Sequence, residues 1–387
     1  MVRFSDRLPA DLAPNALARA RDGRSEVPFD LTVSNPTRCS LPYPVGLLET
    51  LARDEGLDYR PDPAGLPEAR HAVAASYARR GIEVDPRRVI LTASTSEAYG
   101  FLFKLLCDPG DRLLIPTPSY PLLQHLAALE GLRPLAYRLD AHGAWQPDVR
   151  SLDGAGARAI VVVHPNNPTG SYVDRPVAAE LLEACARAGA ALIADEVFFD
   201  FPLVDRPDAA SFAEEQRALT FTLGGLSKQL GLPQLKLSWI VVGGGEAEAT
   251  RAVERLCFIA DQYLSVATPV QLALEDLLLR GSSVHAAIHE RCRRNLDALS
   301  RVVAGRGGVT LLRPAGGWSA VLRYPAVVDE ERLALELLVE DGVAVHPGYF
   351  FDFPADGYLV VSLLPEGSVF DEGIARLLRR LGALGAG

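Results

Sequence analysis

Short apolar runs alternate through most of the chain with segments whose apolar residues recur at helical spacing. Residues 65–81 carry apolar positions three and four apart and end in glycine, which predicts a helix. The next apolar run, residues 88–94, predicts a buried strand. Further strands are expected at residues 111–118, 133–139, 157–163, 191–201, 218–225 and 236–244. Continuous apolar strands separated by helices indicate a largely parallel sheet with helices on both faces.

The pattern changes toward the end of the chain. Long helices are expected over residues 268–281 and 285–305, and the tail then mixes strands with helices. The first forty residues form a polar arm that ends in a turn-rich segment. We therefore expect an α/β fold with a large domain flanked by helices and a smaller α+β domain. The expected boundaries are an arm at 1–45 that packs with the small domain, a large domain at 46–270 and a small domain at 271–387.

Composition narrows the class of protein. A chain of 387 residues is long enough for two domains of ordinary size. Its formal net charge of -10 argues against a nucleic acid or an anionic membrane as partner. No apolar run reaches the ~18 residues of a membrane span, and the first residues do not resemble a secretory signal. The five cysteines are scattered without a CxxC motif, so we expect free thiols and a cytoplasmic protein.

The chain lacks the sequence motifs of several common binding and catalytic sites. The chain has no GxxxxGK[ST] phosphate loop, no GxGxxG after a strand and no GxSxG nucleophile turn. His285 and His289 are four residues apart on an expected helix, but HExxH and a third ligand are missing. We therefore expect no metal site.

Polar residues follow three of the expected strands. Asp195 ends one apolar run, Asn167 lies in the turn after another, and Lys228 lies in a glycine-rich turn after a third. Only three of the 39 basic residues are lysines, so a lysine here is unusual for this chain. In open α/β sheets, ligands bind beyond the carboxyl ends of the strands. These side chains are therefore expected to meet in one crevice.

A fourth strand end adds an anion site. Three hydroxyl residues open the helix after the strand at 88–94, and they are Ser94, Thr95 and Ser96. Hydroxyls and free N–H groups at a helix start favour an anion. An amine, a carboxylate and an anion site together suit a cofactor with an aldehyde, a basic nitrogen and a phosphate. Pyridoxal 5'-phosphate has all three groups.

Eight motifs follow one another in order over nearly the whole chain. They are SNPT, YRPDPAGLPEAR, LTASTSEA, PTPSYP, HPNNPTG, ADEVFFDF, GGLSKQLGLPQLKLSW and HPGYFF. With them the chain resembles a class I/II aminotransferase of the aspartate aminotransferase fold group, fold type I. The resemblance implies a pyridoxal-phosphate-dependent enzyme that transfers an amino group between an amino acid, or an amine, and a 2-oxo acid.

The resemblance also implies roles for single residues. Lys228 would form a Schiff base with the cofactor aldehyde and then carry the reacting proton. Asp195 would pair with the protonated ring nitrogen, and Asn167 would hydrogen-bond the ring hydroxyl. Tyr120 would stack on the ring.

The resemblance also implies which residues bind the cofactor phosphate. Its expected partners within the subunit are Ser94, Thr95, Ser96, Ser227 and Lys236. Tyr59 would reach the phosphate in the neighbouring subunit, which implies a homodimer with composite sites. Asn35 and Arg38, in the SNPTR turn, are expected at the substrate.

The chain departs from the family pattern at four positions. Phe198 stands where a tyrosine is usual, Gly225 where a serine is common, and Lys236 where an arginine is usual. Val360 stands where the family usually has the arginine that binds the substrate carboxylate. Since a buried carboxylate needs a cationic partner, Arg38 is the expected substitute, or the substrate is not an ordinary α-amino acid.

Two other functions remain open at this point. A C–S β-lyase or an amino-acid oxidase would use the same cofactor and fold. These reactions differ in which substrate bond lies perpendicular to the ring and in the fate of the carbanion, and their products tell them apart. A non-catalytic regulator would use the fold as a ligand sensor. Such regulators usually carry an added DNA-binding domain, and the arm of about 40 residues is short for one.

Overall fold

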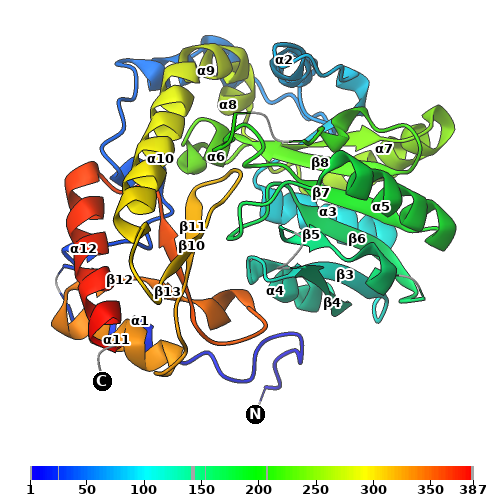
Figure 1. Cartoon of the computed structure of the whole chain (residues 1–387). Helices are drawn as coiled ribbons and strands as arrows, with labels where there is room; N and C mark the ends of the chain where they lie inside the picture. Colours follow the sequence, from blue (N-terminus) through cyan, green and yellow to red (C-terminus); the bar gives the residue numbers. More distant parts are fainter. Residues whose placement is uncertain (1, 25, 141–143, 153, 206–207, 385–387) are drawn as a thin grey trace.

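The computed structural model describes residues 2–24, 26–140, 144–152, 154–205 and 208–384. An eight-stranded sheet forms the larger half of the molecule (Figure 1). In spatial order its strands are β2 (Val89–Thr92), β9 (Ser238–Gly243), β8 (Thr220–Gly225), β7 (Ala191–Asp195), β6 (Ala157–Val163), β3 (Arg112–Thr117), β4 (Arg133–Asp140) and β5 (Gln146–Pro147). Only β9 and β5 run against the others, which confirms the largely parallel sheet.

Helices cover both faces of this sheet because successive strand residues point to opposite sides. Ile193 of β7 packs with the helices of one face, and Leu192 with those of the other. The first face is covered by α3 (Thr95–Leu106), α4 (Leu122–Leu129) and α7 (Glu246–Asp261). The second is covered by α2 (Pro67–Ala78), α5 (Arg175–Ala188), α8 (Thr268–Leu272) and α9 (Leu274–Arg280).

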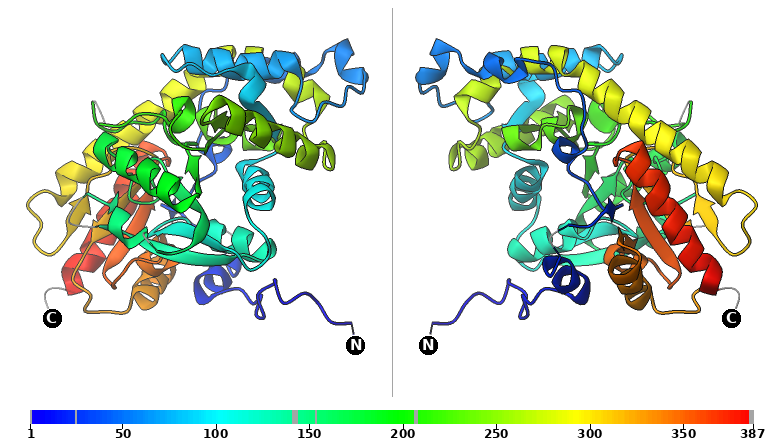
Figure 2. Two further views of the ribbon diagram at one scale, coloured as in Figure 1. Left: turned by 90° about the vertical axis from the view of Figure 1, so that its right-hand side faces the viewer. Right: turned by 90° about the vertical axis from the view of Figure 1, so that its left-hand side faces the viewer.

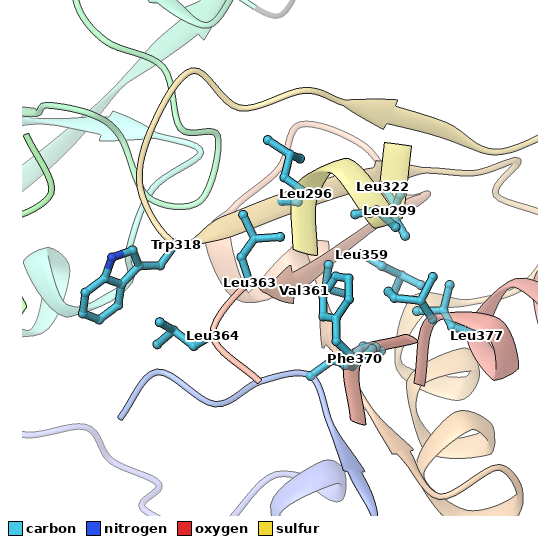
Figure 3. Close-up of a cluster of buried hydrophobic side chains, with 14 of the residues drawn as sticks. Leu296, Leu299, Trp318, Leu322, Leu359, Val361, Leu363, Leu364, Phe370 and Leu377 are labelled. Atoms are coloured by element: carbon cyan, nitrogen blue, oxygen red, sulfur yellow. The ribbon is translucent and has the colours of Figure 1, made fainter. Parts of the chain in front are cut away.

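A second, antiparallel sheet lies beside the first. Its spatial order is β10 (Thr310–Leu312), β11 (Ser319–Arg323), β14 (Tyr358–Ser362) and β13 (His346–Pro347). Three helices pack on it, namely α10 (Ser282–Val303), α11 (Glu330–Glu340) and α12 (Gly367–Leu384). Leu359 and Val361 of β14 point into the apolar core with Phe370 and Leu377 (Figure 3). Val360, between them, faces the opposite way, toward the larger sheet.

The N-terminal arm is more ordered than its polar sequence predicts. It contains a helix, α1 (Ala16–Asp22), and a short strand, β1 (Phe29–Asp30). β1 pairs in parallel with β12 (Val343–Ala344), and α1 packs against α11. The first residues run outward from the body of the molecule (Figure 2). The boundaries expected after residues 45 and 270 stay a prediction.

One expected strand is shorter than the apolar run predicts. The run 191–201 is a strand only as far as Asp195. The backbone N–H of Val197 donates to the Asp195 side chain, and two successive turns then follow up to Phe201. Because the strand stops there, Asp195 lies at the edge of the sheet. Within the described residues, every helix is too short or too polar to cross a membrane.

Candidate active site

The carboxyl ends of β2, β3, β6, β7 and β8 lie at one edge of the large sheet, facing the second sheet. A cavity of about 350 Å³ lies between these strand ends and the second sheet. Eight of the predicted site residues line it, and they are Ser94, Thr95, Ser96, Tyr120, Asn167, Asp195, Ser227 and Lys228. The tertiary structure thus brings together residues that are up to 134 positions apart in the chain (94 to 228).

Asp195 offers a buried carboxylate to this cavity. The Tyr99 hydroxyl donates to its Oδ2 over 2.9 Å, and the Val197 N–H donates to its Oδ1 over 3.2 Å. Burial raises the pKa of the Asp195 carboxyl, while these two donors and the Lys228 ammonium act against that rise. A protonated ring nitrogen would stabilise the same carboxylate, so the site suits a basic heterocycle.

Lys228 presents an amine in apolar surroundings. It lies in the short helix α6 (Leu226–Gln229), directly after β8. Its Nζ is 5.5 Å from the centre of the Phe198 ring and 5.3 Å from that of Trp318. Burial lowers the pKa of Lys228, and the Asp195 carboxylate opposes this shift. A lower pKa increases the fraction of neutral amine, which is the nucleophilic form.

The start of α3 forms a third part of the wall. Ser94 caps the helix, since its Oγ accepts the N–H of Glu97 over 3.1 Å. The Glu97 side chain in turn accepts the N–H of Ala93, one residue before the cap, over 2.7 Å. The cap fixes the first turn with Thr95 and Ser96 beside the cavity. Hydroxyls and N–H groups at this end suit a phosphate.

Two neighbouring asparagines have different surroundings. Asn166 is buried and holds the turn together, donating to Pro118 O and to Thr169 Oγ1. Asn167 lines the cavity, and within the part of the chain that the structure describes its side chain has one long contact, 3.5 Å between Oδ1 and the Ser319 hydroxyl. The Asn167 amide therefore remains available for a ligand. Tyr120 also lines the cavity and is 48% exposed, so its ring has a free face.

Four predicted site residues lie outside this cavity lining. Lys236 is exposed, with a left-handed φ of 50° at the end of a short turn. Tyr59 is 76% exposed on another surface. Arg38 is exposed. The Asn35 side chain is engaged locally, because its Oδ1 accepts from the N–H and the hydroxyl of Thr37.

The structure gives a physical reason for the departure at Gly225 and shows what Phe198 contacts. A Cβ on Gly225 would lie 2.3 Å from Ser238 Oγ, so a serine does not fit beside this neighbour. Phe198 packs edge-to-face on Trp318 at 5.2 Å between ring centres. A ring at Phe198 thus completes the apolar wall next to the Lys228 amine.

Sequence reasoning missed four of the residues that shape the site. Tyr99 follows Thr95 by one helical turn on α3, so helical spacing from the hydroxyl cluster could have found it. Trp318 and Thr32 come from the second sheet and the arm, and no local pattern marks them. His346 opens the HPGYFF motif, but the motif by itself gave it no role in the site. Trp318 Nε1 is buried without a hydrogen-bond partner in the described part of the chain.

These residues fit pyridoxal phosphate. Lys228 suits its aldehyde, Asp195 its ring nitrogen, Asn167 its ring hydroxyl, and the start of α3 its phosphate. No cluster of His, Cys, Asp and Glu among the described residues is suited to a metal ion.

A family model described as aminotransferase class I and II matches residues 47–377. The chain belongs to this family. This match confirms the resemblance seen in the sequence motifs. Class I and II aminotransferases depend on pyridoxal phosphate, and the chain therefore does as well. As a member, the chain is a transaminase that transfers an amino group between an amino acid and a 2-oxo acid.

Curated relatives of this aminotransferase cover most of its length. An alanine aminotransferase from Mycobacterium tuberculosis is 28% identical over 380 residues, which span 91% of this chain and 84% of the relative. The glutamate-pyruvate aminotransferase AlaA from Haemophilus influenzae is 26% identical over 375 residues, spanning 91% and 90%.

Solved structures confirm fold type I. A double mutant of the aspartate aminotransferase from Thermus thermophilus is 25% identical and superposes with a TM-score of 0.83, covering 98% of this chain and 100% of that chain. The alanine aminotransferase from Pyrococcus furiosus has a TM-score of 0.86 at 24% identity, covering 97% and 99%, and shows the shared fold.

Proposed function

We propose that this aminotransferase takes its amino group from a small amino acid such as alanine or glutamate, with Lys228 as its catalytic base. The observation that carries the proposal is the meeting of the Lys228 amine, the Asp195 carboxylate and the start of α3 in one cavity. The curated relatives, named for alanine, glutamate and pyruvate, support the choice of donors. An amine donor remains the alternative.

Each residue of the cavity has a task that follows from its surroundings. Bound pyridoxal phosphate would supply an electron sink for the negative charge that develops at the substrate Cα. Asp195 would keep the ring nitrogen protonated, because its carboxylate is buried and held by Tyr99. Lys228 would take the proton from the substrate Cα and return it. Asn167 and Tyr120 would hold the ring, and Ser94, Thr95, Ser96 and Ser227 its phosphate.

A donor screen with 2-oxoglutarate or pyruvate tests the proposal. We expect the protein to convert amino acids to 2-oxo acids, with a visible absorbance change of the cofactor. Lys228→Ala should leave less than ~1% of the turnover, since loss of the covalent base costs orders of magnitude. Lys104→Ala is the matched control, because Lys104 pairs with Glu130 on the surface. Pyruvate with ammonia, or peroxide, would instead indicate a C–S β-lyase or an oxidase.

We further propose a cytoplasmic homodimer. Tyr59, expected at the neighbouring subunit's phosphate, is exposed in the single chain, as are Leu57 (87%) and Phe258 (73%). Exposed apolar side chains of this kind favour a protein–protein contact. The five cysteines are unpaired, as is usual in a reducing compartment. Lys236 would neutralise the phosphate if the loop around it turns inward in the dimer. Light scattering of the purified protein tests the dimer.

A further inference from the structure

The wall built by the second sheet carries a histidine opposite Val360. β13 and β14 run antiparallel, and His346 is paired directly with Val360. Directly paired residues point to the same face of a sheet, and both of these side chains line the cavity. Val360 stands where the family usually has the carboxylate-binding arginine, but it offers neither charge nor hydrogen-bond donor. His346 is thus the nearest cross-strand substitute for that position.

The charges of the cavity leave few partners for a carboxylate. Among the described residues that line it, only Lys228 and His346 can carry positive charge, and only Asp195 carries a carboxylate. A carboxylate that leaves water needs a cation or strong donors. Lys228 is assigned to the amine chemistry and Asp195 would repel an anion, so His346 remains.

We propose that His346 binds the carboxylate of the amino-acid substrate as an imidazolium that takes up its proton when the carboxylate enters. The identity of the ligand rests on the proposed function, whereas the anion site does not. Thr32 of the arm lines the same cavity, and its backbone acts to raise the pKa of the imidazole. Phe350 and Phe351 pack against the imidazole, each at 5.8 Å between ring centres.

The groups around His346 set the direction of its titration. Burial lowers the pKa of the imidazole, the Asp30 carboxylate of the arm opposes this, and the Arg21 guanidinium adds to it. Arg21 pairs closely with Asp30, so their charges largely offset each other at the ring. Lys228 and Asp195 are the other ionisable lysine and carboxylate side chains that line the same cavity. In the free cavity the imidazole is therefore neutral at neutral pH, and carboxylate binding should strengthen as the pH falls.

Binding of propionate to the holoenzyme, measured by calorimetry between pH 5.5 and 8.5, tests this inference. Propionate is alanine without its amine, and propanamide is an uncharged analogue of the same shape. We expect propionate affinity to fall by up to about tenfold per pH unit above the imidazole pKa, with propanamide unaffected. Measurements in two buffers should show nearly one proton taken up per propionate at pH 7. A flat wild-type profile, or no propionate binding at all, would overturn the proposal.

Variants assign the effect to His346. His346→Gln keeps a side-chain N–H but cannot gain a charge, so propionate binding at low pH should weaken about 10- to 100-fold and lose its pH dependence. His71→Asn, on an exposed face of α2, should keep the wild-type profile. An unchanged profile in His346→Gln would also overturn the inference. Alanine turnover is measured separately. An intact propionate profile in a protein that does not transfer the amino group of alanine would refute only the proposed function. Normal transfer from alanine, with propionate binding unaltered in His346→Gln, would refute only the role of His346.

Discussion

The hydrogen bond from Tyr99 to Asp195 should control how the cofactor affinity depends on pH. Asp195 has two donors, and Tyr99→Phe removes the shorter, at 2.9 Å, while the 3.2 Å bond from Val197 remains. A hydrogen bond to a charged group is worth about 1.5–3 kcal/mol. At 1.36 kcal/mol per unit, its loss raises the pKa of the buried Asp195 carboxyl by about one to two units. This adds to the rise that burial already causes.

The sign of the effect follows from the protonation state that the cofactor needs. The ring nitrogen pairs with the ionised carboxylate, so a protonated Asp195 must first lose its proton. Below the raised pKa, Tyr99→Phe should therefore weaken pyridoxal phosphate binding by about 10- to 100-fold. Above that pKa, both proteins carry the carboxylate and the difference should shrink. The loss of affinity is thus larger at pH 6 than at pH 8.5.

Titration of cofactor-depleted protein with pyridoxal phosphate at these two pH values gives the dissociation constants. Tyr137→Phe is the matched control, because the buried Tyr137 hydroxyl donates to the neutral carbonyl of Val161 over 2.8 Å. It should change cofactor affinity by less than about twofold at either pH. Equal losses for Tyr99→Phe at both pH values would mean that the tyrosine acts through packing. No loss at pH 6 would refute the reasoning entirely.

Three further predictions concern packing, assembly and the substrate. Gly225→Ser should cost about 1–3 kcal/mol of stability and lower the thermal midpoint, because its Cβ meets Ser238 Oγ at 2.3 Å, whereas Gly245→Ser has open space and should be neutral. Tyr59→Phe should weaken pyridoxal phosphate affinity about tenfold in titrations while light scattering still shows a dimer; a fully active monomer would contradict the composite site. Arg38→Ala should leave the KM for alanine within about twofold, and a tenfold rise for alanine but not for ethylamine would assign the carboxylate to Arg38 instead.

The sequence alone predicts the strands, the helices and the chemistry of the cofactor site. Hydrophobic periodicity is a local property of the sequence, so a buried strand such as residues 157–163 can be predicted without tertiary information. The residues at strand ends, including Asp195, Asn167 and Lys228, follow from one topological rule, because parallel strands place their carboxyl ends at one edge. The motifs around them then support the family, which the family model confirms.

Only the tertiary structure decides which side chains complete the site from elsewhere in the chain. His346 lies opposite Val360 because of the register of two short strands, and β13, with two residues, is too short for periodicity to predict. Trp318 reaches Lys228 from a turn before β11, a contact across 90 residues that no local pattern encodes. The sequence of the arm also does not predict its strand, since β1 forms by pairing with β12, more than three hundred residues later in the chain. Local sequence sets the conformation of each segment, whereas long-range pairing and side-chain packing decide which segments meet.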